Sequence, residues 1–158
     1  MSHQEPELVK VLFRYHSKVL DEETVETMWA KTIDSNKGIY QLDSIPFYGP
    51  IIAPNDTFIA KYLDNEQMPT FQEIIEYSGN SVVLVSITNE ETDKETIREK
   101  FKSLNCESEG LNDSYFAMEI PQKVNYKIVK SILEEHENND IFHYAEPCLS
   151  DKHNKDLE

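Results

Sequence analysis

Residues 81–87 read Ser-Val-Val-Leu-Val-Ser-Ile, a run in which apolar side chains follow one another with almost no alternation. A strand with one face in water alternates apolar and polar residues, whereas a strand covered by other elements is apolar along its length. The run therefore predicts a central strand that is covered on at least one face. The elements that flank it define the rest of the fold.

Two amphipathic helices are predicted downstream of this strand. Residues 92–95, Thr-Asp-Lys-Glu, match a capping box, and Asn125 is the expected cap of the second helix. Apolar residues then recur at helical spacing, as Ile97, Phe101 and Leu104 in the first helix and as Tyr126, Val129, Ile132 and Leu133 in the second. With short strands expected at 106–111, 115–120 and 141–144, the element order is that of the ferredoxin-like βαββαβ plan.

The first half of the chain predicts β structure. Strands are expected at 8–16, 26–33, 39–42 and 56–63, with a tight turn over 34–38 that ends at a glycine. Residues 45–50, Ile-Pro-Phe-Tyr-Gly-Pro, cannot form a central strand because proline lacks the backbone N–H that the ladder needs. Short strands joined by tight turns favour a small curled sheet or an SH3-like barrel.

The predicted fold class is therefore α+β. A β-rich subdomain is expected over residues 1–72 and a ferredoxin-like α+β subdomain over 73–150, with the two sharing one core. Residues 151–158 are polar, which predicts a frayed tail.

Several segments resemble a bacterial family catalogued as domain of unknown function 4265. They are 26–30 (Glu-Thr-Met-Trp-Ala), 40–49 (Tyr-Gln-Leu-Asp-Ser-Ile-Pro-Phe-Tyr-Gly), 77–81 (Tyr-Ser-Gly-Asn-Ser) and 115–121 (Tyr-Phe-Ala-Met-Glu-Ile-Pro). The resemblance extends from about Val9 to Leu149 and implies the fold and a bacterial setting, without an activity or an active site. Where this chain has Asn80, the family commonly has His, so a role of that His does not carry over.

Acidic side chains dominate the composition. The 158 residues include 30 Asp and Glu against 15 Lys and Arg, a formal net charge of −15. A field of this sign repels nucleic acid and attracts basic partners. No apolar run approaches the roughly 20 residues that span a membrane, and the first residues lack a signal-peptide pattern, so we expect a cytoplasmic protein without membrane contact.

Residue patterns for catalysis or for a cofactor are weak. Cys106 and Cys148 stand apart without a CxxC partner, and the histidines are scattered, at His3, His16, His136, His143 and His153. The four glycines do not match a phosphate-binding loop, so no metal or other cofactor is expected. Asp43 and Asp56 are the one carboxylate pair considered for acid–base chemistry, with turn or cap duty as the alternative.

These observations favour an interaction protein, not an enzyme. The leading hypothesis is an immunity protein whose acidic surface neutralises a basic, nuclease-type toxin domain. The candidate contact residues are Glu90, Glu91, Asp93, Glu134, Glu135 and Glu137, together with Tyr48 in the apolar loop. That loop has two further interpretations: an aromatic anchor for a partner, or packing between the subdomains.

The alternative hypothesis is a regulatory module that binds a small ligand. Its pocket would lie between the two subdomains, where clefts commonly form. Trp29, Tyr40 and Tyr48 would then face that cleft.

Overall fold

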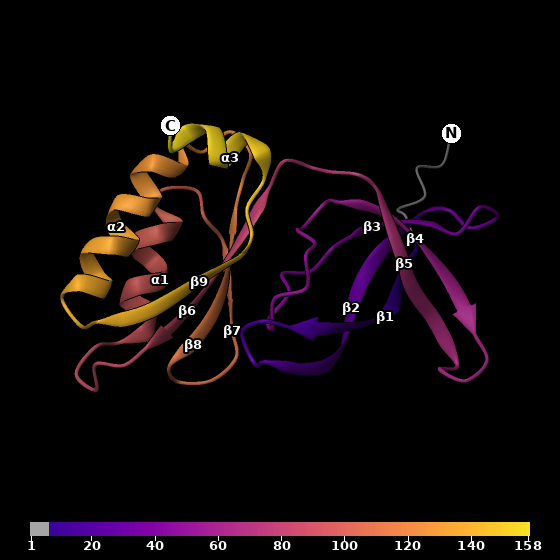
Figure 1. The fold of residues 1–158 in the computed structure, drawn as a ribbon, viewed down its shortest axis with the longest axis horizontal. Coiled ribbons are helices and arrows are strands. Elements are labelled where there is room, and N and C mark those ends of the chain that lie inside the picture. Colours follow the sequence, from indigo (N-terminus) through magenta and orange to yellow (C-terminus); the bar gives the residue numbers. More distant parts are fainter. Residues whose placement is uncertain (1–6) are drawn as a thin grey trace.

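The computed structural model describes residues 7–158, which fold into a strand-rich α+β protein with nine strands and three helices. The first five strands are β1 (Leu8–Ser17), β2 (Glu22–Asp34), β3 (Ile39–Leu42), β4 (Thr57–Leu63) and β5 (Met68–Glu76). The following elements are β6 (Ser81–Ile87), α1 (Lys94–Lys102), β7 (Ser108–Gly110), β8 (Tyr115–Ile120), α2 (Tyr126–Asn138), β9 (Phe142–Cys148) and α3 (Asp151–Asp156). Figure 1 shows β1–β5 on one side and the remaining elements on the other.

The first five strands form a closed barrel in chain order. Alternation of side chains along β1 and β2 directs Val11, Phe13, Met28 and Ala30 into the barrel core. The turn between β2 and β3 requires Gly38, because its φ is +68° and an added Cβ would lie 2.7 Å from the carbonyl oxygen of Ala60. The strands predicted from the sequence in this half are therefore present, with β2 longer than expected.

Strand β5 is the strand that the sequence did not predict. Its pairing with β4 shifts register at two places, so its side chains do not keep the strict alternation by which strands are recognised. Pro69 further weakens the strand pattern. The expected division after residue 72 lies within β5, and the chain enters the second sheet only after residues 77–80.

The second sheet has the strand order β7-β8-β6-β9, and α1 and α2 cover one of its faces (Figure 1). Asn125 is the cap of α2, as predicted. The capping box expected over residues 92–95 would make Thr92 the cap of α1, whereas the structure has Asp93 in that position. Alternate residues of β6, including Val83 and Val85, pack under the helices. Leu84 packs on the opposite face, which explains why this strand carries apolar residues on both faces.

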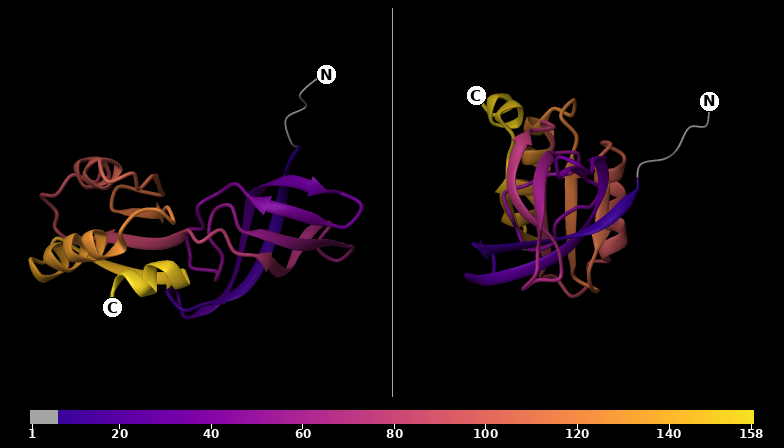
Figure 2. Two further views of the ribbon diagram at one scale, coloured as in Figure 1. Left: turned by 90° about the horizontal axis from the view of Figure 1, so that it is seen from above. Right: turned by 90° about the vertical axis from the view of Figure 1, so that its right-hand side faces the viewer.

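The opposite face of the second sheet packs on the loop between β3 and β4. Ile45, Phe47 and Ala53 of this loop pack with Leu84 of β6 and Ala117 of β8. The left view in Figure 2 shows the barrel and the second sheet lying side by side along the long axis of the molecule. The loop therefore joins the two parts, and the apolar segment 45–50 packs between them.

Helix α3 replaces the frayed tail expected at residues 151–158. Ser150 caps this helix, and the His153 side chain is fully buried. The prediction was wrong because it used only the polarity of the segment, whereas His153 is held by polar groups of distant residues.

Candidate functional site

Two segments that each carry a pair of exposed glutamates meet at one end of the helical layer. Glu90 and Glu91 lie in the loop between β6 and α1, and Glu134 and Glu135 lie in the last turns of α2. Two backbone N–H groups of that loop donate to the carbonyl oxygen of Ile141, just after α2, at 3.1 and 3.2 Å. Figure 1 shows the two segments together at the lower left of the molecule. We call these four residues the acidic end.

The acidic end carries little compensating charge. None of its four carboxylates forms an ion pair within residues 7–158. A shallow cavity of about 330 Å³ lies beside it between α1 and α2, lined by Thr92, Ile97, Lys100, Glu135, His136, Asn139 and Ile141. Lys100 is the one lysine or arginine in this lining. The surface is therefore negative and open to a partner.

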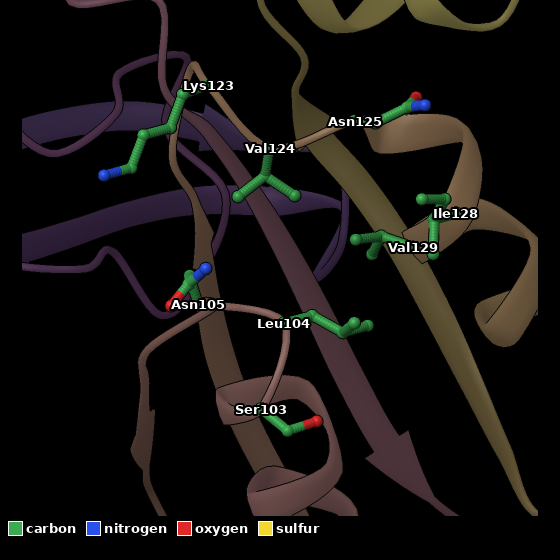
Figure 3. A pocket seen from close by; sticks show the side chains of 8 residues that line it. All are labelled: Ser103, Leu104, Asn105, Lys123, Val124, Asn125, Ile128 and Val129. Carbon is green, nitrogen blue, oxygen red and sulfur yellow. The ribbon is translucent and has the colours of Figure 1, made fainter.

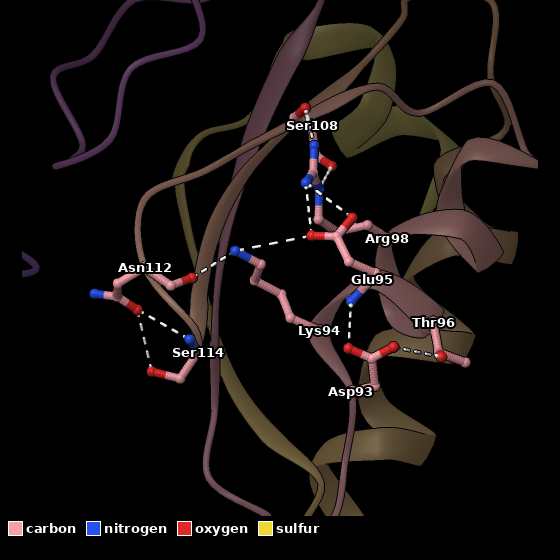
Figure 4. A network of polar contacts seen from close by, with 8 residues as sticks. All are labelled: Asp93, Lys94, Glu95, Thr96, Arg98, Ser108, Asn112 and Ser114. Atoms are coloured by element: carbon pink, nitrogen blue, oxygen red, sulfur yellow. Dashed lines mark hydrogen bonds and ion pairs between the residues drawn. The ribbon is translucent and has the colours of Figure 1, made fainter.

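Asp93 lies close to the acidic end but has a structural role. Its carboxylate accepts hydrogen bonds from the Glu95 backbone N–H at 3.3 Å and from the Thr96 hydroxyl at 3.2 Å (Figure 4). In the same network Arg98 binds Glu95 at 3.0 Å and donates to Ser108 of β7. The side chain of Asp93 is thus occupied as the cap of α1.

The remaining two candidate residues are also bound within the protein. Glu137 accepts a hydrogen bond from the backbone N–H of Tyr144 at 3.2 Å and lies 3.9 Å from His143. Tyr48 is half-buried, and its carbonyl oxygen accepts a hydrogen bond from the hydroxyl of Ser17. It lies in the loop between the two parts, and the structure does not bring it into the acidic end.

A buried carboxylate that the sequence analysis missed holds this loop. Glu26 is 8% exposed, and its two oxygens lie 2.8 and 3.2 Å from the Phe47 backbone N–H. The hydroxyl of Tyr115 donates to the Phe47 carbonyl oxygen from the second sheet. Burial raises the pKa of Glu26. The burial of Glu26 could have been predicted from the alternation along β2, because Glu26 occupies an inward-facing position between Thr24 and Met28.

Asp43 and Asp56 do not form a catalytic pair. Asp56 is buried and accepts hydrogen bonds from the backbone N–H groups of Ala53 at 2.9 Å and Ser78 at 2.8 Å. Asp43 is exposed and lies 3.8 Å from Lys31. Asp56 therefore has a structural role, because its carboxylate connects the loop between β3 and β4 to the segment that leads into the second sheet.

A cavity of about 460 Å³ lies at the junction of the two parts. Its lining includes Asp56, Asn80, Cys148 and Lys152, whereas Trp29, Tyr40 and Tyr48 are not part of it. The Asn80 amide donates to the carbonyl oxygen of Pro54 at 3.0 Å and to Glu119 at 3.2 Å, and accepts from the Gln122 N–H at 2.9 Å. The Asn80 amide is therefore already hydrogen-bonded to other groups of this protein.

A further open cavity of about 370 Å³ lies where α1 ends and α2 begins. Figure 3 shows Leu104, Val124 and Val129 forming its apolar floor, with the amine of Lys123 pointing away. Asn125, on its rim, is occupied as the cap of α2. Ser103 and Asn105 add polar groups to this lining.

Within residues 7–158, the cysteines and histidines do not gather into one cluster. Burial raises the pKa of both Cys106 and Cys148 to about 12, which keeps the thiols protonated at neutral pH. No cluster of three potential metal ligands occurs among residues 7–158, and His3 lies outside this range. Within the described part of the chain, no helix is long and apolar enough to cross a membrane.

The fold and site together define a class: a two-part α+β protein with an exposed carboxylate surface. The chain belongs to the family described as Domain of unknown function (DUF4265), whose model matches residues 26–144. A solved structure titled "Novel crystal structure of a hypothetical protein from Neisseria gonorrhoeae" is similar, with a TM-score of 0.77 and 21% identity. The match covers 95% of this chain and 99% of that one, and it shows the shared fold. A search of curated proteins finds no match.

Proposed function

We propose that this protein is an acidic interaction protein that binds and neutralises a basic partner. The observation that supports the proposal is the acidic end, where the loop after β6 meets the end of α2 and each of these two segments carries two exposed glutamates. Carboxylates that lack partners in the protein remain available to lysine and arginine side chains of another molecule.

The specific form of the proposal is an immunity protein against a bacterial toxin, with a nuclease domain as the favoured target. A nuclease site is basic because its substrate is a polyanion, so an acidic surface is able to occupy it in place of the substrate. The net charge of −15 supports fast capture, since opposite fields raise association rates. The proposal includes a cytoplasmic location, no enzymatic activity, and a scaffold of an SH3-like barrel on a ferredoxin-like unit.

Charge-reversal variants test the proposal. We compare E90K/E91K and E134K/E135K with E73K/E76K, which introduces the same charge change at exposed positions of β5. Each tagged protein is used for a pull-down from a lysate of the source bacterium at about 50 mM and about 500 mM salt, with mass spectrometry of the bound proteins.

The expected result is a basic protein that stays bound at low salt and is depleted at high salt. Both acidic-end variants lose it and the β5 variant retains it. The proposal is overturned if the wild-type protein retains no basic partner, or if all three variants lose the partner equally. In the second case the net charge, and not the acidic end, governs capture.

A second candidate function is the binding of a small ligand, with the junction cavity of about 460 Å³ as the observation that favours it. This volume is in the range of small-molecule sites, which is roughly 300–1,000 Å³. A thermal-shift screen of metabolites tests it. A ligand that stabilises the wild-type protein but not a variant with Cys148→Trp, which would fill the cavity, supports this function.

A further inference from the structure

The barrel closes through a short contact between its first and last strands. β1 pairs with β2 along its whole length, but it pairs with β5 only at Leu12 and Thr70. Beyond Leu12, residues 13–16 of β1 have no ladder partner on the side away from β2. An unpaired strand edge presents backbone N–H and C=O groups to any extended chain that approaches it.

Two adjoining cavities lie beside this edge. The first has a volume of about 310 Å³ and is bounded by residues 13–16, by 49–52 and by Phe71. The second, of about 280 Å³, shares His16, Gly49 and Ile51 with the first and continues to Val19 and Pro147. We call the combined surface the barrel-mouth groove.

The groove exposes apolar side chains that the fold does not use. Ile51 lines both cavities and is 68% exposed, and Val19 at the far end is 40% exposed. Phe13 and Phe71 form the floor of the first cavity, with ring centroids 5.1 Å apart. An apolar cavity beside a free strand edge is the combination that binds extended peptides, since the edge bonds the backbone and the cavity takes a side chain.

The charges along the groove differ from those of the protein as a whole. Arg14, His16 and Lys18 line it, and its one carboxylate, Glu146, is paired with Lys130 at 2.7 Å. Lys18 has no ion-pair partner within residues 7–158. Of the other two, Arg14 lies 2.8 Å from Glu66 and remains half exposed, and His16 lies 3.4 and 3.6 Å from Asp21 and Glu23. Lys18 and the exposed part of Arg14 are therefore the cations of the groove lining that an acidic segment contacts, because the one carboxylate of the lining is already paired.

We propose that the barrel-mouth groove binds an extended peptide segment of another protein, which adds as a strand to the free edge of β1. One apolar side chain of the segment enters the cavity over Phe13 and Phe71, and its acidic side chains lie toward Arg14 and Lys18. This surface is separate from the acidic end. Its partner segment is acidic, whereas the partner proposed for the acidic end is basic. The inference does not depend on the function proposed above.

A peptide library tests the inference without assuming a partner. Phage-displayed random decapeptides are selected on the wild-type protein and counter-selected on the Ile51→Asp variant. Ile51 is exposed, so this substitution leaves the core intact. The aspartate carboxylate removes the apolar contact with the segment and repels its acidic side chains. Ile33→Asp is the matched control, because Ile33 is also exposed, at 53%, but lies on the outer face of β2. Selected peptides are then measured by fluorescence anisotropy.

The expected peptides alternate apolar and acidic residues and bind in the micromolar range. Their affinity falls at least about tenfold with Ile51→Asp, stays unchanged with Ile33→Asp, and is lost when a central residue is replaced by proline, which cannot pair as a strand. Three results overturn the inference: no enrichment over the counter-selection, enrichment of lysine-rich peptides, or proline variants that bind as well as their parents. None of these results bears on capture of a basic partner by the acidic end.

Discussion

The hydroxyl of Ser81 lies 2.5 Å from Nδ1 of His153, although 72 positions separate the two residues in the chain. The other ring nitrogen, Nε2, lies 2.9 Å from the carbonyl oxygen of Pro121, which only accepts hydrogen bonds. Nε2 therefore carries the hydrogen and Nδ1 accepts one from Ser81. The Ser81 oxygen in turn accepts the N–H of Ser150 at 2.8 Å. A buried neutral imidazole thus docks α3 on the second sheet.

The first prediction concerns this imidazole and pH. Burial lowers the pKa of His153 in the folded protein; the adjacent Lys152 also lowers it, while Asp156 and the Pro121 carbonyl raise it. Below the unfolded-state pKa of about 6.5, the unfolded chain takes up a proton that the folded protein does not. The stabilisation is therefore complete above that pH and is lost as the pH falls toward the folded-state pKa.

We expect this contribution to the free energy of unfolding to fall between pH 7 and pH 5, by at most about 1.4 kcal/mol per pH unit. Urea unfolding of the wild-type protein and of His153→Gln at both pH values measures it, because the difference between the two proteins removes the titration of all other groups. An identical pH dependence in both proteins would show that the imidazole does not titrate differently on folding.

The second prediction concerns the hydroxyl of Ser81. Ser81→Ala leaves the N–H of Ser150 and Nδ1 of His153 without their partner in a buried place. We expect a loss of about 1–3 kcal/mol in the free energy of unfolding. Ser86→Ala, at an exposed position of the same strand, is the control and should change it by less than about 0.5 kcal/mol. Chemical denaturation measures both, and equal losses would contradict a docking role.

The third prediction concerns Glu26 at the boundary between the two parts. Glu26→Ala leaves the Phe47 N–H without an acceptor, which we expect to destabilise the protein by about 1–3 kcal/mol. Glu26→Gln keeps an acceptor and should cost less. The raised pKa of Glu26 means that the folded protein binds a proton more readily than the unfolded chain, so this group favours folding as the pH falls below neutral. Denaturation of the three proteins at pH 7 and pH 5 separates these effects; a pH dependence unchanged in Glu26→Gln would contradict the assignment.

The fourth prediction separates capping from binding at the start of α1. Asp93→Ala removes the acceptor for the Glu95 N–H, and we expect it to cost about 1 kcal/mol in stability. Glu90→Ala should leave stability within about 0.5 kcal/mol, since Glu90 is exposed and forms no ion pair within residues 7–158. Thermal unfolding compares the two variants, and a larger loss for Glu90→Ala than for Asp93→Ala would reverse the two roles.

An element was predictable from the sequence where the residues that form it lie close together in the chain. The turn at Gly38 and the helix cap at Asn125 were predicted, and the cap of α1 was placed one residue early, because each depends on residues within a few positions. Strand β5 was not predicted, because its pairing with β4 is interrupted by register shifts that the sequence pattern does not carry. For the site, the exposed acids were identified, yet Asp93 and Glu137 prove to be bound within the protein.

The sequence by itself determined the local elements and the sign of the surface charge, because alternation, capping and composition need no distant partner. Tertiary structure alone decided what depends on contacts across the chain. It anchored the loop around Phe47 on the buried Glu26, docked α3 through Ser81 and His153, and brought the two segments of the acidic end together. The physical reason is that the burial and pairing of a polar group depend on what the rest of the chain places beside it.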